Sequence, residues 1–316
     1  MNDLILLNYI IFAALFTLLL LELAGAIISI LDTDLYKRKA LVYLAPLWEI
    51  TGTLSVFYLV NLVATYPGLL PTIDYLYLAP ILAAAVFLIA RDTYLAYSEL
   101  SLEKRENRKH ARAYGILTIL TMFLIITALS SSVSGGGVNP TQPSVNLISL
   151  LFNKFNILIF AAIIALASSC GMIFFGLKYP KTLAILATSS ALLLLAALKL
   201  HAPYILTGMA NSPAYLTPIL VLLVLLSAAY LTGSRYTKYL VLPFLFIGIL
   251  TFEFFQYPYL FGGATNLGNF TATQPTAEYI ILFTLAGAVF LGVALGLFFY
   301  VHHSKRRRTK AIYPKT

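Results

Sequence analysis

Residues 4–31 form the stretch LILLNYIIFAALFTLLLLELAGAIISIL, in which Glu22 is the one charged side chain. The hydrocarbon core of a membrane is about 30 Å thick, and a helix of about 20 apolar residues crosses it. This stretch is long enough to do so. It follows directly on Met1-Asn2-Asp3, without the basic segment that begins a signal peptide, so we expect it to remain as a first membrane-spanning helix.

Similar apolar blocks fill the rest of the 316-residue chain, which is 60% hydrophobic and 10% charged. So few charges exclude a soluble globular protein, and so much apolar surface excludes disorder. The blocks do not alternate with polar residues, which excludes an outer-membrane β-barrel. We therefore predict an all-α polytopic membrane protein, one integral membrane domain over residues 1–316 with a basic cytoplasmic tail at 303–316. The predicted spans are 4–31, 41–65, 73–97, 113–132, 155–177, 181–201, 214–233, 238–257 and 278–302.

The basic residues predict how these nine spans are oriented. With this division, 18 of the 21 Lys and Arg residues fall on one side, in alternate loops and in the tail. Short loops rich in Lys and Arg stay in the cytoplasm. We therefore predict a multi-pass cell-membrane protein with its N-terminus outside and its C-terminus in the cytoplasm. The same rule explains the net charge of +9 without a nucleic-acid partner.

Charged residues inside the spans are the first candidates for function, because burying a charge in a membrane is costly. Counted from the cytoplasmic ends at 1.5 Å per residue, Glu22, Glu49 and Arg91 lie about 13, 12 and 9 Å deep. Asp92 follows Arg91 directly. Three consecutive spans thus carry charges at one level, which predicts a cytoplasmic proton pathway through Glu22, Glu49, Arg91 and Asp92. A structural ion pair of Arg91 with Asp92 and one Glu is the alternative.

Two further charges lie nearer the outer ends of their spans. Lys199 is one turn from an end, where its long side chain reaches the interface. Glu253, close to Gln256 and Tyr257, is interpreted as a carboxylate at the interface, with an outer cavity as the alternative.

Histidine and cysteine usage argues against a cofactor on this chain. His110, His302 and His303 belong to the cytoplasmic margin, and His201 lies alone at the outer edge, whereas a haem held by two histidines needs two buried imidazoles. Cys170 is the one cysteine and lies in an apolar run. We expect no catalytic residue, bound cofactor or metal site in this chain.

Two segments resemble a known family. Residues 43–49, YLAPLWE, resemble the Ala-Pro-x-Trp-acid segment in the second subunit of cytochrome bd-type quinol oxidases. Glu49 replaces the Asp usual there, and Ile50-Thr51 replace Gly-Asn. Residues 255–260, FQYPYL, are similar to the family's Pro-Tyr segment, which a polar outer loop, a last span and a basic tail follow in both.

The resemblance implies a haem-free subunit of a respiratory quinol:oxygen oxidoreductase that is not catalytic alone. Its partner would be the haem-bearing first subunit, in a heterodimer that allows small accessory membrane subunits and is surrounded by membrane lipid. Haems are then expected in the partner, and quinol is the substrate of the complex. Glu22 and Arg91 fall where the family has an acidic pair and an Arg, which implies a proton pathway through the inner-half acids. The implied fold is two antiparallel four-helix bundles plus one additional helix.

Other functions remain open from the residues themselves. A secondary transporter needs broken helices and polar groups at the midplane, whereas these spans are long and their polar residues favour the inner half. A quinone-binding anchor of another respiratory complex is a second alternative. A purely structural anchor is the third.

Overall fold

The computed structural model describes the backbone of residues 2–31, 34–100, 104–139, 144–177, 179–234 and 236–312, and the side chains of 2–31, 47–97, 109–139, 145–177, 179–234 and 236–294. Within these ranges nine helical segments are long and apolar enough to cross a membrane. The predicted all-α polytopic fold is therefore confirmed. The long helices are α1 (Asp3–Ile30), α2 (Asp34–Thr65), α3 (Leu70–Leu100), α4 (Lys104–Ser134), α6 (Lys154–Phe175), α7 (Pro180–His201), α9 (Thr217–Leu231), α10 (Thr237–Gln256) and α11 (Gln274–Ile312).

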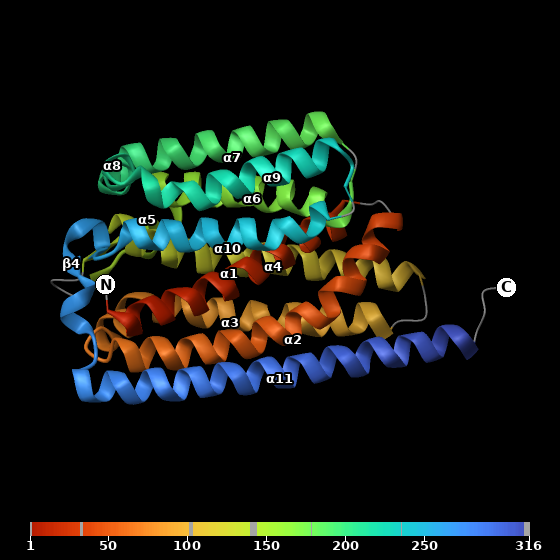
Figure 1. The fold of residues 1–316 in the computed structure, drawn as a ribbon, viewed down its shortest axis with the longest axis horizontal. Helices are drawn as coiled ribbons and strands as arrows, with labels where there is room; N and C mark the ends of the chain where they lie inside the picture. The colour runs from red at the N-terminus through yellow and green to blue at the C-terminus, as the bar shows by residue number, and fades with distance from the viewer. Residues whose placement is uncertain are drawn as a thin grey trace.

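The long helices run antiparallel between two faces of the molecule (Figure 1). The chain begins at one face, called here the N-terminal face, and α11 ends beyond the other, called the C-terminal face. The first bundle consists of α1 to α4, and the second of α6, α7, α9 and α10. Helix α11 packs outside both, against α2 and α1. This arrangement is the expected pair of four-helix bundles with a ninth helix.

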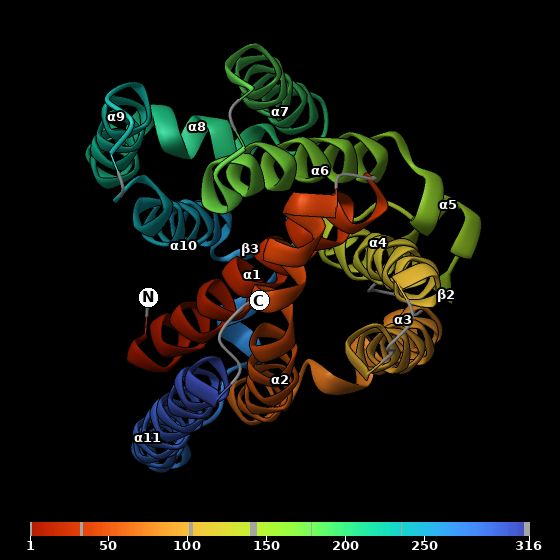
Figure 2. The same cartoon turned by 90° about the vertical axis from the view of Figure 1, so that its right-hand side faces the viewer.

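Helix α1 is the centre of the fold, and Figure 2 shows it surrounded by its neighbours. It packs against α2, α4, α6, α10 and α11 and carries the highest share of buried residues among the candidate spans. Small residues bring the helices close: a Cβ on Gly171 of α6 would lie 2.6 Å from Cβ of Ala24. Such close contacts replace the hydrophobic effect as the force between membrane helices. Most side chains of α1 are therefore surrounded by other helices of the protein.

Short elements cover the N-terminal face. They are the hairpin β1 (Val138–Asn139) and β2 (Ser144–Val145), α5 (Leu147–Phe152), α8 (Pro203–Asn211), η1 (Pro213–Leu216), the hairpin β3 (Tyr259–Leu260) and β4 (Thr265–Asn266), η2 (Phe261–Gly263) and η3 (Leu267–Phe270). Asparagine side chains fix several turns here. For example, Asn153 Oδ1 accepts from the backbone N–H of Asn156 at 2.8 Å and caps α6. The N-terminal face is thus an ordered cap over the ends of the spans.

Three helices extend furthest beyond the predicted spans. Helix α2 begins at Asp34 instead of residue 41, α4 begins at Lys104 instead of 113, and α11 continues to Ile312 instead of ending at 302. The added turns are rich in charged residues. A search for apolar stretches does not include them, because a helix that leaves the membrane no longer needs apolar side chains.

Candidate functional site

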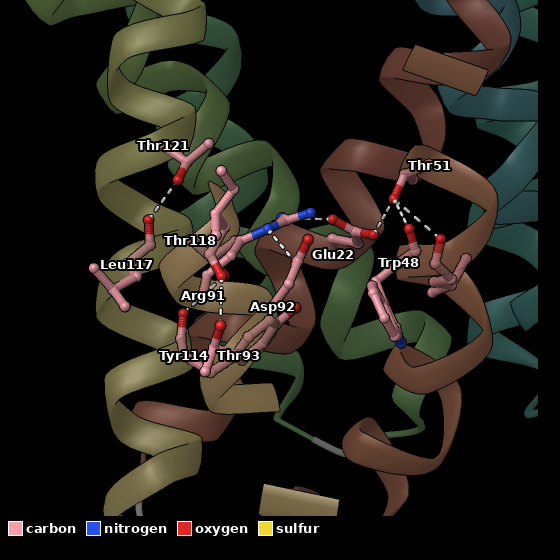
Figure 3. A network of polar contacts seen from close by, with 12 residues as sticks. Glu22, Trp48, Thr51, Arg91, Asp92, Thr93, Tyr114, Leu117, Thr118 and Thr121 are labelled. Carbon is pink, nitrogen blue, oxygen red and sulfur yellow. Dashed lines mark hydrogen bonds and ion pairs between the residues drawn. The ribbon is translucent and has the colours of Figure 1, made fainter. Parts of the chain in front are cut away.

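Glu22 lies on α1 at the centre of the first bundle and is fully buried, with 0% of its surface exposed. A buried carboxylate is stable only when charged or hydrogen-bonding partners replace its water. The structure supplies a partner for each oxygen. Arg91 Nη1 of α3 donates to Glu22 Oε2 at 2.7 Å, and the Thr51 hydroxyl of α2 donates to Glu22 Oε1 (Figure 3).

Arg91 connects the buried Glu22 carboxylate with a second carboxylate, that of Asp92. The Arg91 side chain is 3% exposed, and its Nε donates to Asp92 Oδ1 at 3.1 Å. The Asp92 side chain is 23% exposed and thus reaches the surface of the chain. Figure 3 shows Arg91 extended between the two acids. Asp92, Arg91 and Glu22 therefore form one continuous polar connection from the surface of the chain to its interior.

Thr51 extends the connection into α2. Its side chain is buried, and its Oγ1 also lies 3.1 Å from the carbonyl oxygens of both Leu47 and Trp48. A hydroxyl has one hydrogen to donate and can accept another. Thr51 can therefore donate either to Glu22 or to the carbonyl groups of its own helix.

Glu49 lies outside this connection. It is exposed on α2, whereas Thr51, two residues later, faces Glu22. Each residue of an α-helix advances by about 100°, so residues two apart point to nearly opposite sides. The sequence placed Glu49 at the same depth as Glu22 but did not show on which side of the helix its side chain lies. The structure brings together Glu22, Arg91 and Asp92, and leaves Glu49 on the surface of the chain.

Two polar groups near Glu22, Thr51 and Tyr114, were not expected from the sequence, whereas Glu253 was named there. Tyr114 of α4 is fully buried beside the ion pair, interacts electrostatically with Glu22 and Arg91, and its hydroxyl has no hydrogen-bond partner among the described residues. Glu253 of α10 is 8% exposed, whereas the sequence placed it at the interface. No apolar or charge pattern could find Tyr114, because 21 tyrosines are spread along the chain.

The histidines with described side chains pack against aromatic rings. The ring centroid of His110 lies 5.8 Å from that of Tyr94 and 5.6 Å from that of Tyr97, and His201 lies 5.6 Å from Phe155. Within the described ranges, no three His, Cys, Asp or Glu side chains gather as metal ligands. His302 and His303 lie outside the described side chains. Where the haems of the complex bind stays a prediction.

Comparisons with known proteins agree with this architecture. A solved structure, the bd oxidase from Geobacillus thermodenitrificans, matches 96% of this chain and 99% of its own chain with a TM-score of 0.72 and 18% sequence identity. Likeness at this identity shows a shared fold. The comparison with curated protein sequences finds no match.

A family model gives the membership. The model of cytochrome bd terminal oxidase subunit II matches residues 4–302, nearly the whole chain, and so confirms the resemblance carried by residues 43–49 and 255–260. This family supplies a membrane subunit of a respiratory oxidoreductase that contains haem. The chain therefore belongs to the family of cytochrome bd terminal oxidase subunit II.

Proposed function

We propose that this chain is the haem-free subunit of a quinol:oxygen oxidoreductase, and that it carries protons from its C-terminal face toward the haem-bearing partner subunit. The observation that carries the proposal is the buried Glu22, whose two oxygens contact Arg91 and Thr51 while Asp92 links Arg91 to the surface. A carboxyl group that can bind and release a proton, reached from outside by a second carboxylate, suits proton transfer. The C-terminal face is the cytoplasmic face in the proposed orientation.

The order of groups follows from their burial. Asp92 takes up a proton at the surface, water carries it past Arg91 to Glu22, and Glu22 holds it in the interior beside the Thr51 hydroxyl, from where water carries it on. Arg91 keeps its charge throughout and positions both acids. Glu49, exposed on the other side of α2, is proposed as a separate carboxylate of the pathway at the surface of the chain.

A structural ion pair is the competing function for the same residues. A lone charge left in a protein interior costs about 3–5 kcal/mol when its partner is removed. Glu22→Gln alone would therefore test folding as much as proton transfer. The double variant Glu22→Gln/Arg91→Gln removes both fully buried charges together and leaves only the partly exposed Asp92 without its ionic partner.

The experiment measures quinol oxidation and the haem spectrum of the purified complex. We expect the double variant to assemble with normal haem content and to lose at least tenfold in turnover. Glu278→Gln, which removes an exposed carboxylate near the N-terminal face, is the matched control and should behave as wild type. Normal turnover in the double variant contradicts the pathway and leaves a structural ion pair.

The absence of haem from this subunit is tested separately. We expect the chain, expressed and purified without its partner, to show no Soret absorption. A stoichiometric Soret band would contradict this part of the proposal without affecting the proton pathway.

A further inference from the structure

A second group of buried polar atoms lies at the other end of the bundle. Among the described residues, five buried side-chain atoms lack a hydrogen-bond partner, and one of them is the Tyr114 hydroxyl. The other four are Asn8 Nδ2, Thr65 Oγ1, Tyr66 OH and Glu253 Oε2. Buried polar groups are nearly always paired in folded proteins, so each exception requires a cause.

These four atoms lie close to the N-terminal face on three neighbouring elements. Asn8 is five residues from the start of α1, Thr65 ends α2, and Glu253 is three residues from the end of α10. At 1.5 Å per residue, all of them lie within about 8 Å of a helix end. Helix α1 packs against both α2 and α10, so the three helix ends meet at this face.

Electrostatic contacts place the phenols around the same carboxyl group. Glu253 interacts with Tyr9 of α1 and with Tyr58 and Tyr66 of α2. Tyr257, directly after α10, interacts with Tyr9 and Tyr66. The groups of α1 and α2 that interact with Glu253 are therefore phenols, and the described residues offer it no ion pair. In this respect Glu253 is the opposite of Glu22, which has a cationic partner.

Water has the right hydrogen-bonding capacity for these four atoms. A buried water molecule makes two to four hydrogen bonds, and it both donates and accepts. Asn8 Nδ2 donates, the hydroxyl groups of Thr65 and Tyr66 do both, and Glu253 Oε2 accepts when ionised. Burial raises the pKa of the Tyr66 phenol, so this group keeps its proton at neutral pH. Water can therefore satisfy each kind of group present, whereas a cation would need more oxygen ligands and no donors.

We propose that internal water bridges Glu253 to Tyr66, and that this hydrated cluster exchanges protons between Glu253 and the N-terminal face. The Glu253 carboxyl group gives a proton to the bridging water and recovers one from it, so that no other reactant is needed. This cluster around Glu253 is distinct from the polar connection through Asp92, Arg91 and Glu22, which opens toward the C-terminal face.

A density map of the intact oxidase complex, at a resolution that shows water molecules, tests whether water lies between Glu253 and Tyr66. We expect density within hydrogen-bond distance of both Glu253 Oε2 and Tyr66 OH. A cation with several oxygen ligands in its place, or a protein group of the partner bonded to Glu253, overturns the proposal.

Infrared difference spectra of the complex test the exchange. The bands removed by Glu253→Gln belong to this carboxyl group, and we expect them to shift within seconds when D2O replaces H2O. Tyr66→Phe should change their position, whereas Tyr259→Phe, which removes an exposed hydroxyl at the same face, should not. The proposal is overturned if the Glu253 bands do not shift in D2O, or if Tyr66→Phe leaves their position unchanged. Each of the three substitutions nearly keeps the size of the native side chain, so the folded complexes can be compared.

Discussion

Thr51→Val is the most selective test of the relay at Glu22. The substitution keeps the branched shape of the side chain and removes only the hydroxyl that donates to Glu22 Oε1. Arg91 still pairs with Glu22 Oε2 at 2.7 Å, so no buried charge loses its ionic partner. An unpaired buried acceptor costs about 1–3 kcal/mol, a loss that a large membrane subunit tolerates.

The magnitude expected for turnover follows from the geometry. Thr51 is the group through which the described hydrogen bonds continue from Glu22 into α2, at the carbonyl oxygens of Leu47 and Trp48. Without the hydroxyl, Glu22 Oε1 loses the hydrogen-bond partner that α2 supplies when the carboxyl group binds and releases a proton. We expect quinol-driven oxygen consumption to fall at least tenfold, which corresponds to about 1.4 kcal/mol in the barrier.

Thr51→Ser is the matched control, because it keeps the hydroxyl and removes the methyl group. It should retain most of the turnover, with haem content unchanged in both variants. Turnover of Thr51→Val equal to that of Thr51→Ser refutes the relay. An equal loss in both variants would show that the complete Thr51 side chain is needed and would not single out the hydroxyl.

Further predictions concern the surface, the topology and the packing. Glu49→Gln should lower oxygen-coupled quinol oxidation at least tenfold, while Glu49→Asp keeps most of it; wild-type turnover in Glu49→Gln would remove Glu49 from the pathway. Reporter fusions after Thr141 and after Arg235 should lie outside and in the cytoplasm, and both on one side would refute the proposed orientation. Gly171→Ala should lower the melting temperature of the complex, because its Cβ would lie 2.6 Å from Cβ of Ala24 and overpacking costs about 1–3 kcal/mol. Unchanged melting would show that α6 has room to move away from α1.

The sequence predicted the spans well because membranes impose a simple requirement on length and polarity. Each predicted apolar block corresponds to a helix, and the two bundles follow the predicted arrangement. The helical turns outside the membrane, such as the first turns of α2 and α4, were not predictable from hydropathy. They carry charged residues, and their helical state depends on continuation from the span.

The sequence predicted how deep the residues of the candidate site lie in their spans, but not which side of each helix carries them. Glu22 and Arg91 were placed at similar levels, and they form an ion pair. The choice between Glu49 and Thr51 was not predictable, because a span in lipid is apolar on all sides and its sequence does not mark the face that meets α1. The burial of Glu253 depends on the packing of α10 against α1, which the sequence of α10 does not contain.

Side-specific proton uptake is the most direct test of the central claim. Right-side-out vesicles that contain the reduced oxidase and an enclosed pH indicator receive a pulse of oxygen, and the interior pH is followed during one turnover. We predict that the wild-type complex takes up protons from the interior, where the C-terminal face lies, and that Glu22→Gln/Arg91→Gln slows this uptake at least tenfold at unchanged haem content. Uptake at the wild-type rate in this variant would contradict a proton pathway through Glu22.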